Sequence, residues 1–231
     1  MKPIDSLPAI RIVATAFGDL RPDVMFVGGA ITGLLVTDPA APASRLTVDV
    51  DVVVDIATRA EYVRLIERLR DLGFVEDTRD GAPACRWVVQ GITVDVMSAG
   101  PQPGPTSRWY AEALAHANSV AITEDVSVRV ISAPYFLATK LDAFGDGQRD
   151  DLVASRDIED VVAVIDGRAT IEQEIAAAPP SVRQYLREQF RSLLANSDFD
   201  NAVAGHLPGD SASQARLPLV LSRMRAIATA A

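Results

Sequence analysis

The stretch TVDVDVVVD, residues 47–55, alternates valines with polar residues along most of its length. Because successive side chains of a strand point to opposite faces, this period of two predicts a strand. Asp49 and Asp51 then project from one face, with about 7 Å between their backbone positions. Two neighbouring carboxylates repel each other unless they are protonated or share a cation. The spacing suits Mg²⁺, which prefers carboxylate and phosphate oxygens, but it also fits an edge strand whose polar face is solvated.

A further acid occurs in the same setting at Asp95, within ITVDVM, residues 92–97. We expect a hairpin of strands 84–89 and 92–97, joined by a turn at Gln90-Gly91. If strand 92–97 lies beside strand 47–55, Asp95 joins the pair. Three convergent carboxylates can hold two metal ions about 4 Å apart in phosphoryl or nucleotidyl transfer. The alternative is a lone surface aspartate on a hairpin.

Paired glycines follow a short apolar run at residues 24–27, and a helix is expected over residues 30–36. Gly28-Gly29 would let the backbone approach an anion at a helix N-terminus, although many strand–helix turns use glycine for geometry alone. The phosphate-binding pattern GxxxxGK[ST] is absent from the sequence.

The remaining pattern predicts an α/β (α+β) fold: a small mixed sheet with flanking helices, followed by a mainly helical C-terminal part. We place the α/β core at residues 1–103 and the helical part, which would close a cleft, at residues 104–231, with the boundary in a Pro/Gly-rich stretch. Helices are expected over residues 7–20, 108–117, 135–144 and 218–228, with capping signals for others at Thr58-x-x-Glu61, Ser155, Thr170-x-x-Gln173 and Ser181-x-x-Gln184.

Composition narrows the class of protein. The 231 residues are 48% apolar and carry a net charge of −9, which excludes a disordered chain and disfavours a broad nucleic-acid surface, though not a local site for an RNA end. One cysteine excludes an internal disulfide framework and suits a reducing compartment. The sequence shows no signal peptide and no apolar run of membrane length, so we expect a cytoplasmic protein that does not contact membranes.

The order of the Gly28-Gly29 pair, Asp49-x-Asp51 and Asp95 resembles the polymerase-β-like nucleotidyltransferase superfamily, although Gly29 replaces the serine that is usual there. Two later segments, FLATKLDAF (136–144) and SRDIEDV (155–161), are similar to the lysine and KDxxD-like motifs of AbiEii-type nucleotidyltransferases. That group comprises toxins of type IV toxin–antitoxin systems and includes the MenT-type tRNA nucleotidyltransferases. The resemblance spans about residues 28–166, with Arg156 in place of the usual lysine.

The resemblance implies an enzyme of the EC 2.7.7 type that transfers an NMP from an NTP to an acceptor hydroxyl. The acceptor stays open between an RNA such as tRNA, a protein and a small molecule, and a cognate antitoxin is an implied partner. The implied metal ligands, for Mg²⁺ or Mn²⁺, are Asp49, Asp51 and Asp95. The implied nucleotide-binding residues are Gly28, Gly29, Thr47 and Lys140, and the implied further active-site residues are Asp157 and Asp160.

Simpler interpretations exist for the second group of residues. Lys140 shares a helix face with Phe136 and Phe144, where an unpaired ammonium is costly unless it pairs with a triphosphate or extends to solvent. Asp157 and Asp160 suit the first turns of any helix. The whole chain is alternatively a catalytically silent nucleotide-binding or partner-binding protein, a hypothesis that the Gly29 substitution and the acidic surface favour.

Overall fold

The computed structural model describes residues 6–100, 106–145 and 151–230. The chain forms two compact units: residues 1–31 with 46–132, and residues 32–45 with 133–231. The boundary predicted at residue 103 lies outside the described residues, and the division of the chain at that point stays a prediction.

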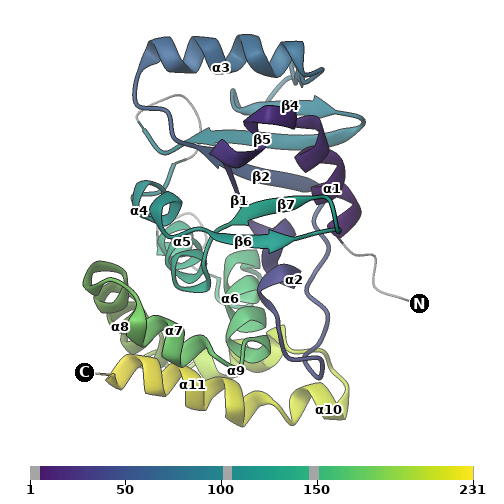
Figure 1. Cartoon of the computed structure of the whole chain (residues 1–231). Helices are drawn as coiled ribbons and strands as arrows, with labels where there is room; N and C mark the ends of the chain where they lie inside the picture. The colour runs from purple at the N-terminus through teal and green to yellow at the C-terminus, as the bar shows by residue number, and fades with distance from the viewer. Residues whose placement is uncertain (1–5, 101–105, 146–150, 231) are drawn as a thin grey trace. The chain divides into compact units, whose positions relative to one another are not determined.

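The first unit is built on a seven-stranded sheet of order β3-β4-β5-β2-β1-β7-β6, whose strands lie side by side in Figure 1. Strand β2 is parallel to β5 and antiparallel to β1, so the sheet is mixed and the predicted fold class is confirmed. The strands are β1 (Val24–Val27), β2 (Asp49–Val54), β3 (Val75–Glu76), β4 (Arg86–Val89), β5 (Ile92–Ser98), β6 (Asn118–Ala121) and β7 (Ser127–Val130).

Helices α1 (Leu7–Ala16), α3 (Arg59–Asp71) and α4 (Tyr110–Ala115) complete this unit. Helix α1 packs on β2 and β5, and it ends earlier than expected because Gly18 takes a positive φ of +53° and starts a 3₁₀ segment, η1 (Gly18–Asp23). The helix expected over 108–117 is likewise shorter than its pattern suggests. The buried ring of Phe17 contacts the rings of Phe26 and Phe74, at centroid distances of 6.5 and 4.8 Å.

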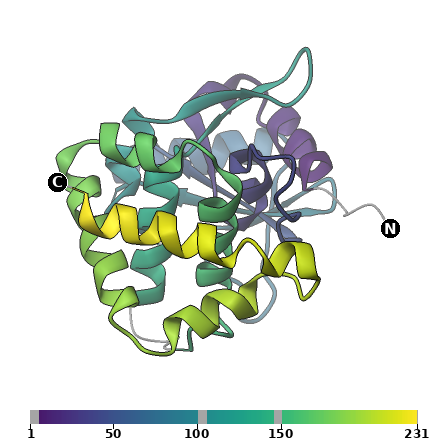
Figure 2. The same cartoon turned by 90° about the horizontal axis from the view of Figure 1, so that it is seen from below.

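The second unit is helical, with α5 packed against α6 and α8, and α11 packed on α8 and α6. In Figure 2, α11 crosses the front of this unit in yellow. Its helices are α2 (Thr32–Leu35), α5 (Ala133–Gly145), α6 (Arg156–Gly167), α7 (Ile171–Ala177), α8 (Pro180–Leu194), α9 (Phe199–His206), α10 (Ser211–Gln214) and α11 (Leu217–Thr229).

The loop after α2 is hydrogen-bonded to the end of α6. The amides of Thr37 and Asp38 both donate to the Gly167 carbonyl, at 2.8 Å each. A Cβ at Gly167 would lie 2.6 Å from a methyl carbon of Val36, so only glycine permits this approach. The described part of the chain contains no helix that is both long and apolar enough to cross a membrane.

Two of the four capping predictions are confirmed. Thr58 and Glu61 form the full capping box of α3, and the Ser155 hydroxyl accepts from the Ile158 amide at 3.3 Å. Thr170 stands at the N-cap position of α7, but its hydroxyl donates to Glu174 at 2.6 Å and forms no capping hydrogen bond. Ser181 lies inside α8, which begins one residue earlier because Pro180 already has a helical φ. The helix expected over residues 30–36 is a 3₁₀ turn, η2 (Gly29–Ile31), followed by the single turn of α2.

Candidate active site

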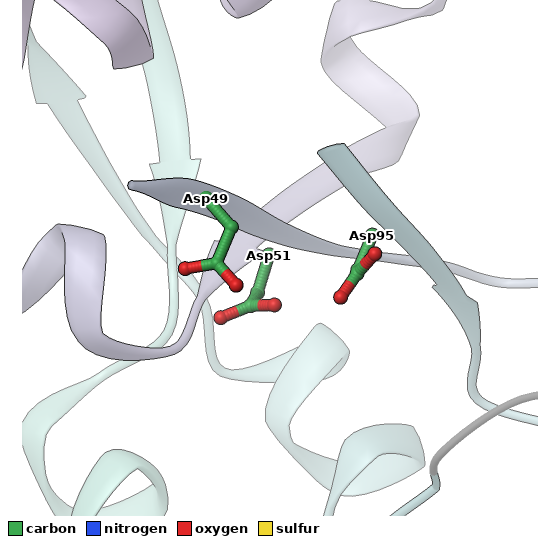
Figure 3. Close-up of side chains that lie close together, drawn as sticks. All are labelled: Asp49, Asp51 and Asp95. Atoms are coloured by element: carbon green, nitrogen blue, oxygen red, sulfur yellow. The ribbon is translucent and has the colours of Figure 1, made fainter. Parts of the chain in front are cut away.

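Strands β2 and β5 bring three aspartates together in the first unit. Their parallel register places Asp51 opposite Asp95, so the condition under which Asp95 joins Asp49 and Asp51 is met. Figure 3 shows Asp49, Asp51 and Asp95 pointing to the same side of these strands. One carboxylate oxygen from each residue lies within 4.8 Å of the other two. We call these three residues the carboxylate triad.

The valines of β2 fix which face the acids occupy. Val50 and Val52 point to the opposite side and are 1% and 0% exposed. Slipping the strand by one residue would bury the aspartates and expose the valines, so the apolar core holds the acids on the polar face. The side chain of Asp49 is 37% exposed and that of Asp95 only 10%, so the triad runs from solvent toward the interior.

Gly28 gives Asp51 the space that its carboxylate fills. This glycine has a φ of +69°, and an added Cβ would lie 1.9 Å from Asp51 Oδ2. Any other residue would therefore strain the backbone and displace a member of the triad. From the sequence, Gly28 was expected either to let the backbone approach an anion or to serve turn geometry alone, and the close contact in the structure is with an aspartate. Nucleotide binding by Gly28 and Gly29 stays a prediction.

Arg86, on β4, holds the third aspartate from the side. Its Nε donates to Asp95 Oδ1 at 2.8 Å and its Nη2 to Asp95 Oδ2 at 2.7 Å. The same Nη2 lies 3.9 Å from Asp49 Oδ2. The hydrogen bonds to Asp95 raise the pKa of the guanidinium despite some burial. Sequence reasoning missed this residue, although counting back from the predicted Gln90-Gly91 turn pairs Arg86 with Asp95.

Thr47 lies two residues before Asp49, and its hydroxyl oxygen Oγ1 is buried without a hydrogen-bond partner among the described residues. A buried hydroxyl that lacks a partner costs about 1–3 kcal/mol. A bound polar molecule beside the start of β2 would remove that cost. The hydroxyl therefore fits the predicted role of Thr47 in nucleotide binding, which itself stays a prediction.

Lys140 is paired inside the second unit. Its Nζ lies 3.1 Å from Asp157 Oδ1 and 2.8 Å from Asp160 Oδ2, and its side chain is only 12% exposed. The ammonium also lies 5.7 Å from the centroid of the Phe136 ring. Burial acts to lower the pKa of Lys140, but the two carboxylates outweigh it and raise the pKa. The lysine thus contacts carboxylates of its own chain and does not extend into solvent.

Asp160 is 1% exposed and has two further partners. Arg45 forms a fork on it, with Nε and Nη2 each 2.9 Å from a carboxylate oxygen, and the Thr32 hydroxyl lies 3.5 Å away. Sequence reasoning missed Arg45, because it sits in a loop 115 positions from Asp160 with no pattern to mark it. We call this group the lysine cluster; its members are Thr32, Arg45, Lys140, Asp157 and Asp160.

Comparison with known families places these residues in context. The profile of the type IV toxin–antitoxin family of nucleotidyl transferase AbiEii toxins matches residues 11–224, a range that includes every residue of the triad and of the lysine cluster. The chain belongs to the AbiEii family. The family resemblance inferred from the sequence is therefore confirmed, and the fold and family of this AbiEii chain support a nucleotidyl transferase activity.

Solved structures resemble the AbiEii chain in fold. A candidate nucleotidyltransferase from H. pylori is similar at a TM-score of 0.50 and 10% identity, over 96% of this chain and 94% of that one. The structure of JHP933 from Helicobacter pylori is similar at a TM-score of 0.46 and 10% identity, over 96% and 91%. No curated protein matches this chain.

Proposed function

We propose that the chain catalyses the metal-dependent transfer of an NMP from an NTP to an acceptor hydroxyl. The observation that carries this proposal is the carboxylate triad, whose three ligand oxygens lie within 4.8 Å of one another. Hard carboxylate oxygens at this spacing fit Mg²⁺ or Mn²⁺, which take oxygen ligands together with substrate phosphates. Asp49, Asp51 and Asp95 would hold the metal.

In the proposed reaction the acceptor oxygen forms a bond to the α-phosphorus of the NTP. The bond from that phosphorus to the oxygen bridging to the β-phosphate breaks, and pyrophosphate leaves. A bound divalent metal supplies stabilisation of the negative charge on the phosphate oxygens. We assign Asp95 to accept the proton of the acceptor hydroxyl. Each of its carboxylate oxygens has two lone pairs, and only one of the two accepts a hydrogen bond from Arg86.

We also assign roles to the predicted nucleotide-binding residues. Gly28, Gly29 and Thr47 would contact the nucleotide through backbone amides and the unpaired hydroxyl, and Lys140 would bind a phosphate. Asp157 and Asp160 act through Lys140 as positioning residues, because both contact its ammonium. A Lys140→Met variant is then expected to raise KM for NTP, while Lys140→Arg keeps the charge and recovers part of the affinity.

Membership of a toxin family suggests two partners beyond the nucleotide. The first is a cognate antitoxin, and the second is an acceptor that carries a hydroxyl, either an RNA such as tRNA or a protein. Cytoplasmic location belongs to the same proposal.

The test is to incubate the full chain with labelled NTPs, Mg²⁺ and total cell RNA or protein, and to measure labelling and pyrophosphate release. Replacing two metal ligands removes several kcal/mol of stabilisation of the transition state. An Asp49→Ala/Asp51→Ala variant is therefore expected to lose about a thousandfold in the rate of transfer. Asp55→Ala is the matched control, because Asp55 is an exposed aspartate just beyond β2, outside the triad.

Labelling that persists in the double variant would remove the catalytic assignment. Metal-dependent NTP binding without pyrophosphate release, measured by calorimetry in the same samples, would instead favour a silent nucleotide-binding protein.

A further inference from the structure

Arg86 and Asp95 form a contact of two hydrogen bonds at the edge of the triad. Both oxygens of Asp95 receive a hydrogen bond, so the plane of the carboxylate is fixed by the planar guanidinium fork. The fork reaches across from β4, where Arg86 and Asp95 are direct antiparallel partners. Because both side chains are mostly buried, at 27% and 10% exposure, water screens this pair only in part.

The same guanidinium is also a charge close to the triad. Its Nη2 lies 2.7 Å from Asp95 and 3.9 Å from Asp49, so it neutralises part of the repulsion among three carboxylates. A divalent cation bound by those carboxylates would be repelled by this fixed positive charge. Arg86 therefore acts on the site in two separable ways, one through its geometry and one through its charge.

We propose that Arg86 is a positioning residue that fixes the orientation of Asp95 and, through its charge, keeps the affinity of the nucleotide-free triad for divalent cations low. This inference rests on the proposed function, in which the triad binds a metal. The geometric part predicts that losing the fork lowers kcat. The charge part predicts that losing the positive charge raises metal affinity, even with no nucleotide present.

A purely structural role predicts something different. A cross-strand ion pair that only stabilises the sheet contributes to the free energy of unfolding, and its loss leaves metal affinity unchanged. The first unit offers a matched control: Arg79 forms the same kind of fork on Asp77, through Nε and Nη2, outside the triad.

The experiment measures Mn²⁺ binding to the full chain by calorimetry without nucleotide, in wild type and in Arg86→Gln, Arg86→Lys and Arg79→Gln. A unit charge about 6 Å from a divalent ion changes its affinity about tenfold, even at the dielectric constant of water. We therefore expect Arg86→Gln to bind Mn²⁺ about tenfold more tightly. Arg86→Lys, which keeps the charge, and Arg79→Gln should stay within about twofold of wild type.

Pyrophosphate release then tests the geometric part in the same variants. Residues that orient metal ligands typically contribute 10–100-fold to activity. Both Arg86→Gln and Arg86→Lys should lose kcat by about this factor with KM for NTP nearly unchanged, while Arg79→Gln keeps both constants. Urea unfolding of each variant shows whether it is folded. If Arg86→Gln is not, Arg86→Met removes the same charge and takes its place, because Arg86→Lys keeps the charge and tests only the geometric part.

The outcomes separate this inference from the function on which it rests. Absence of Mn²⁺ binding in both wild type and Arg86→Gln would overturn the proposed metal site itself. Wild type that binds Mn²⁺, with Arg86→Gln equal or weaker, would overturn the charge role of Arg86. A kcat in Arg86→Lys equal to that of wild type would overturn its positioning role.

Discussion

The carboxylate triad and the lysine cluster both contain aspartates held by an arginine fork, yet their charges balance differently. In the triad, three carboxylates converge, and Arg86 holds Asp95 and lies 3.9 Å from Asp49. The lysine cluster sets two aspartates against an ammonium and a guanidinium, with the half-exposed Glu159 at 3.8 Å from Arg45. The three acids of the first group are close enough to share an external cation, whereas both aspartates of the second group pair with cations of the protein itself.

The two groups also differ in burial. Asp160 is 1% exposed, whereas the side chain of Asp49 is 37% exposed. A buried charge that loses its partner lowers the free energy of unfolding. Removing an exposed charge that its neighbours repel does not lower it. Removing one carboxylate from each group should therefore change stability in opposite directions.

The largest effect is expected for Asp160→Ala. This change leaves Lys140 and Arg45 without their buried partner, and losing one member of a buried ion pair costs about 3–5 kcal/mol. Urea unfolding measures the loss. The control is Asp19→Ala, because Asp19 receives two hydrogen bonds from Arg68 on an exposed surface and its removal should leave the midpoint almost unchanged. Equal losses in the two variants would show that burial adds nothing to the contribution of Asp160 to stability.

Alkaline pH should weaken the lysine cluster next. The pKa of Lys140 is raised above its ordinary 10.5, so its stabilising contribution is complete below pH 10.5 and is lost as the pH rises through the higher value in the folded protein. The difference in free energy of unfolding between wild type and Lys140→Met should stay constant from pH 8 to about pH 10 and shrink above that. A difference that does not change up to pH 12 would show that the ammonium is not stabilised by Asp157 and Asp160.

The smallest effect is expected for Asp49→Asn, and it has the opposite sign. Removing one of three neighbouring negative charges should raise the metal-free stability by less than about 1 kcal/mol, as exposed charges contribute little. The proposed metal site predicts that MnCl₂ raises the melting temperature of wild type, and Asp49→Asn should lose that rise. Thermal unfolding with chelator and with MnCl₂ measures both, and a destabilised Asn variant would argue against repulsion within the triad.

The triad could be predicted from the sequence because its residues lie in local strand patterns. The alternation in residues 47–55 put Asp49 and Asp51 on one face, and a strand pattern around Asp95 made it a candidate for the same face. The pairing of Arg86 with Asp95 could also be predicted, because the two-residue turn fixes the register of the hairpin. Only the adjacency of β2 and β5 needed the structure.

The lysine cluster depends on contacts that no local pattern encodes. Family resemblance marks Lys140, Asp157 and Asp160, whereas their mutual pairing follows from the packing of α5 against α6. Arg45 lies in a loop of Pro, Ala and Asp, where neither periodicity nor capping points to a distant partner. The failure at Ser181 has a different, local cause, since the helix already begins at Pro180, one residue earlier.

The absent side chain of Gly28 makes the triad unusually easy to disable. One added carbon would lie 1.9 Å from Asp51 Oδ2, inside the space that the oxygen occupies. Gly28→Ala leaves every acidic residue in the sequence and yet forces Asp51 from its place. For a member of a toxin family, this offers an attenuated form for expression and for the isolation of an antitoxin complex, with the surface charge of the active protein intact.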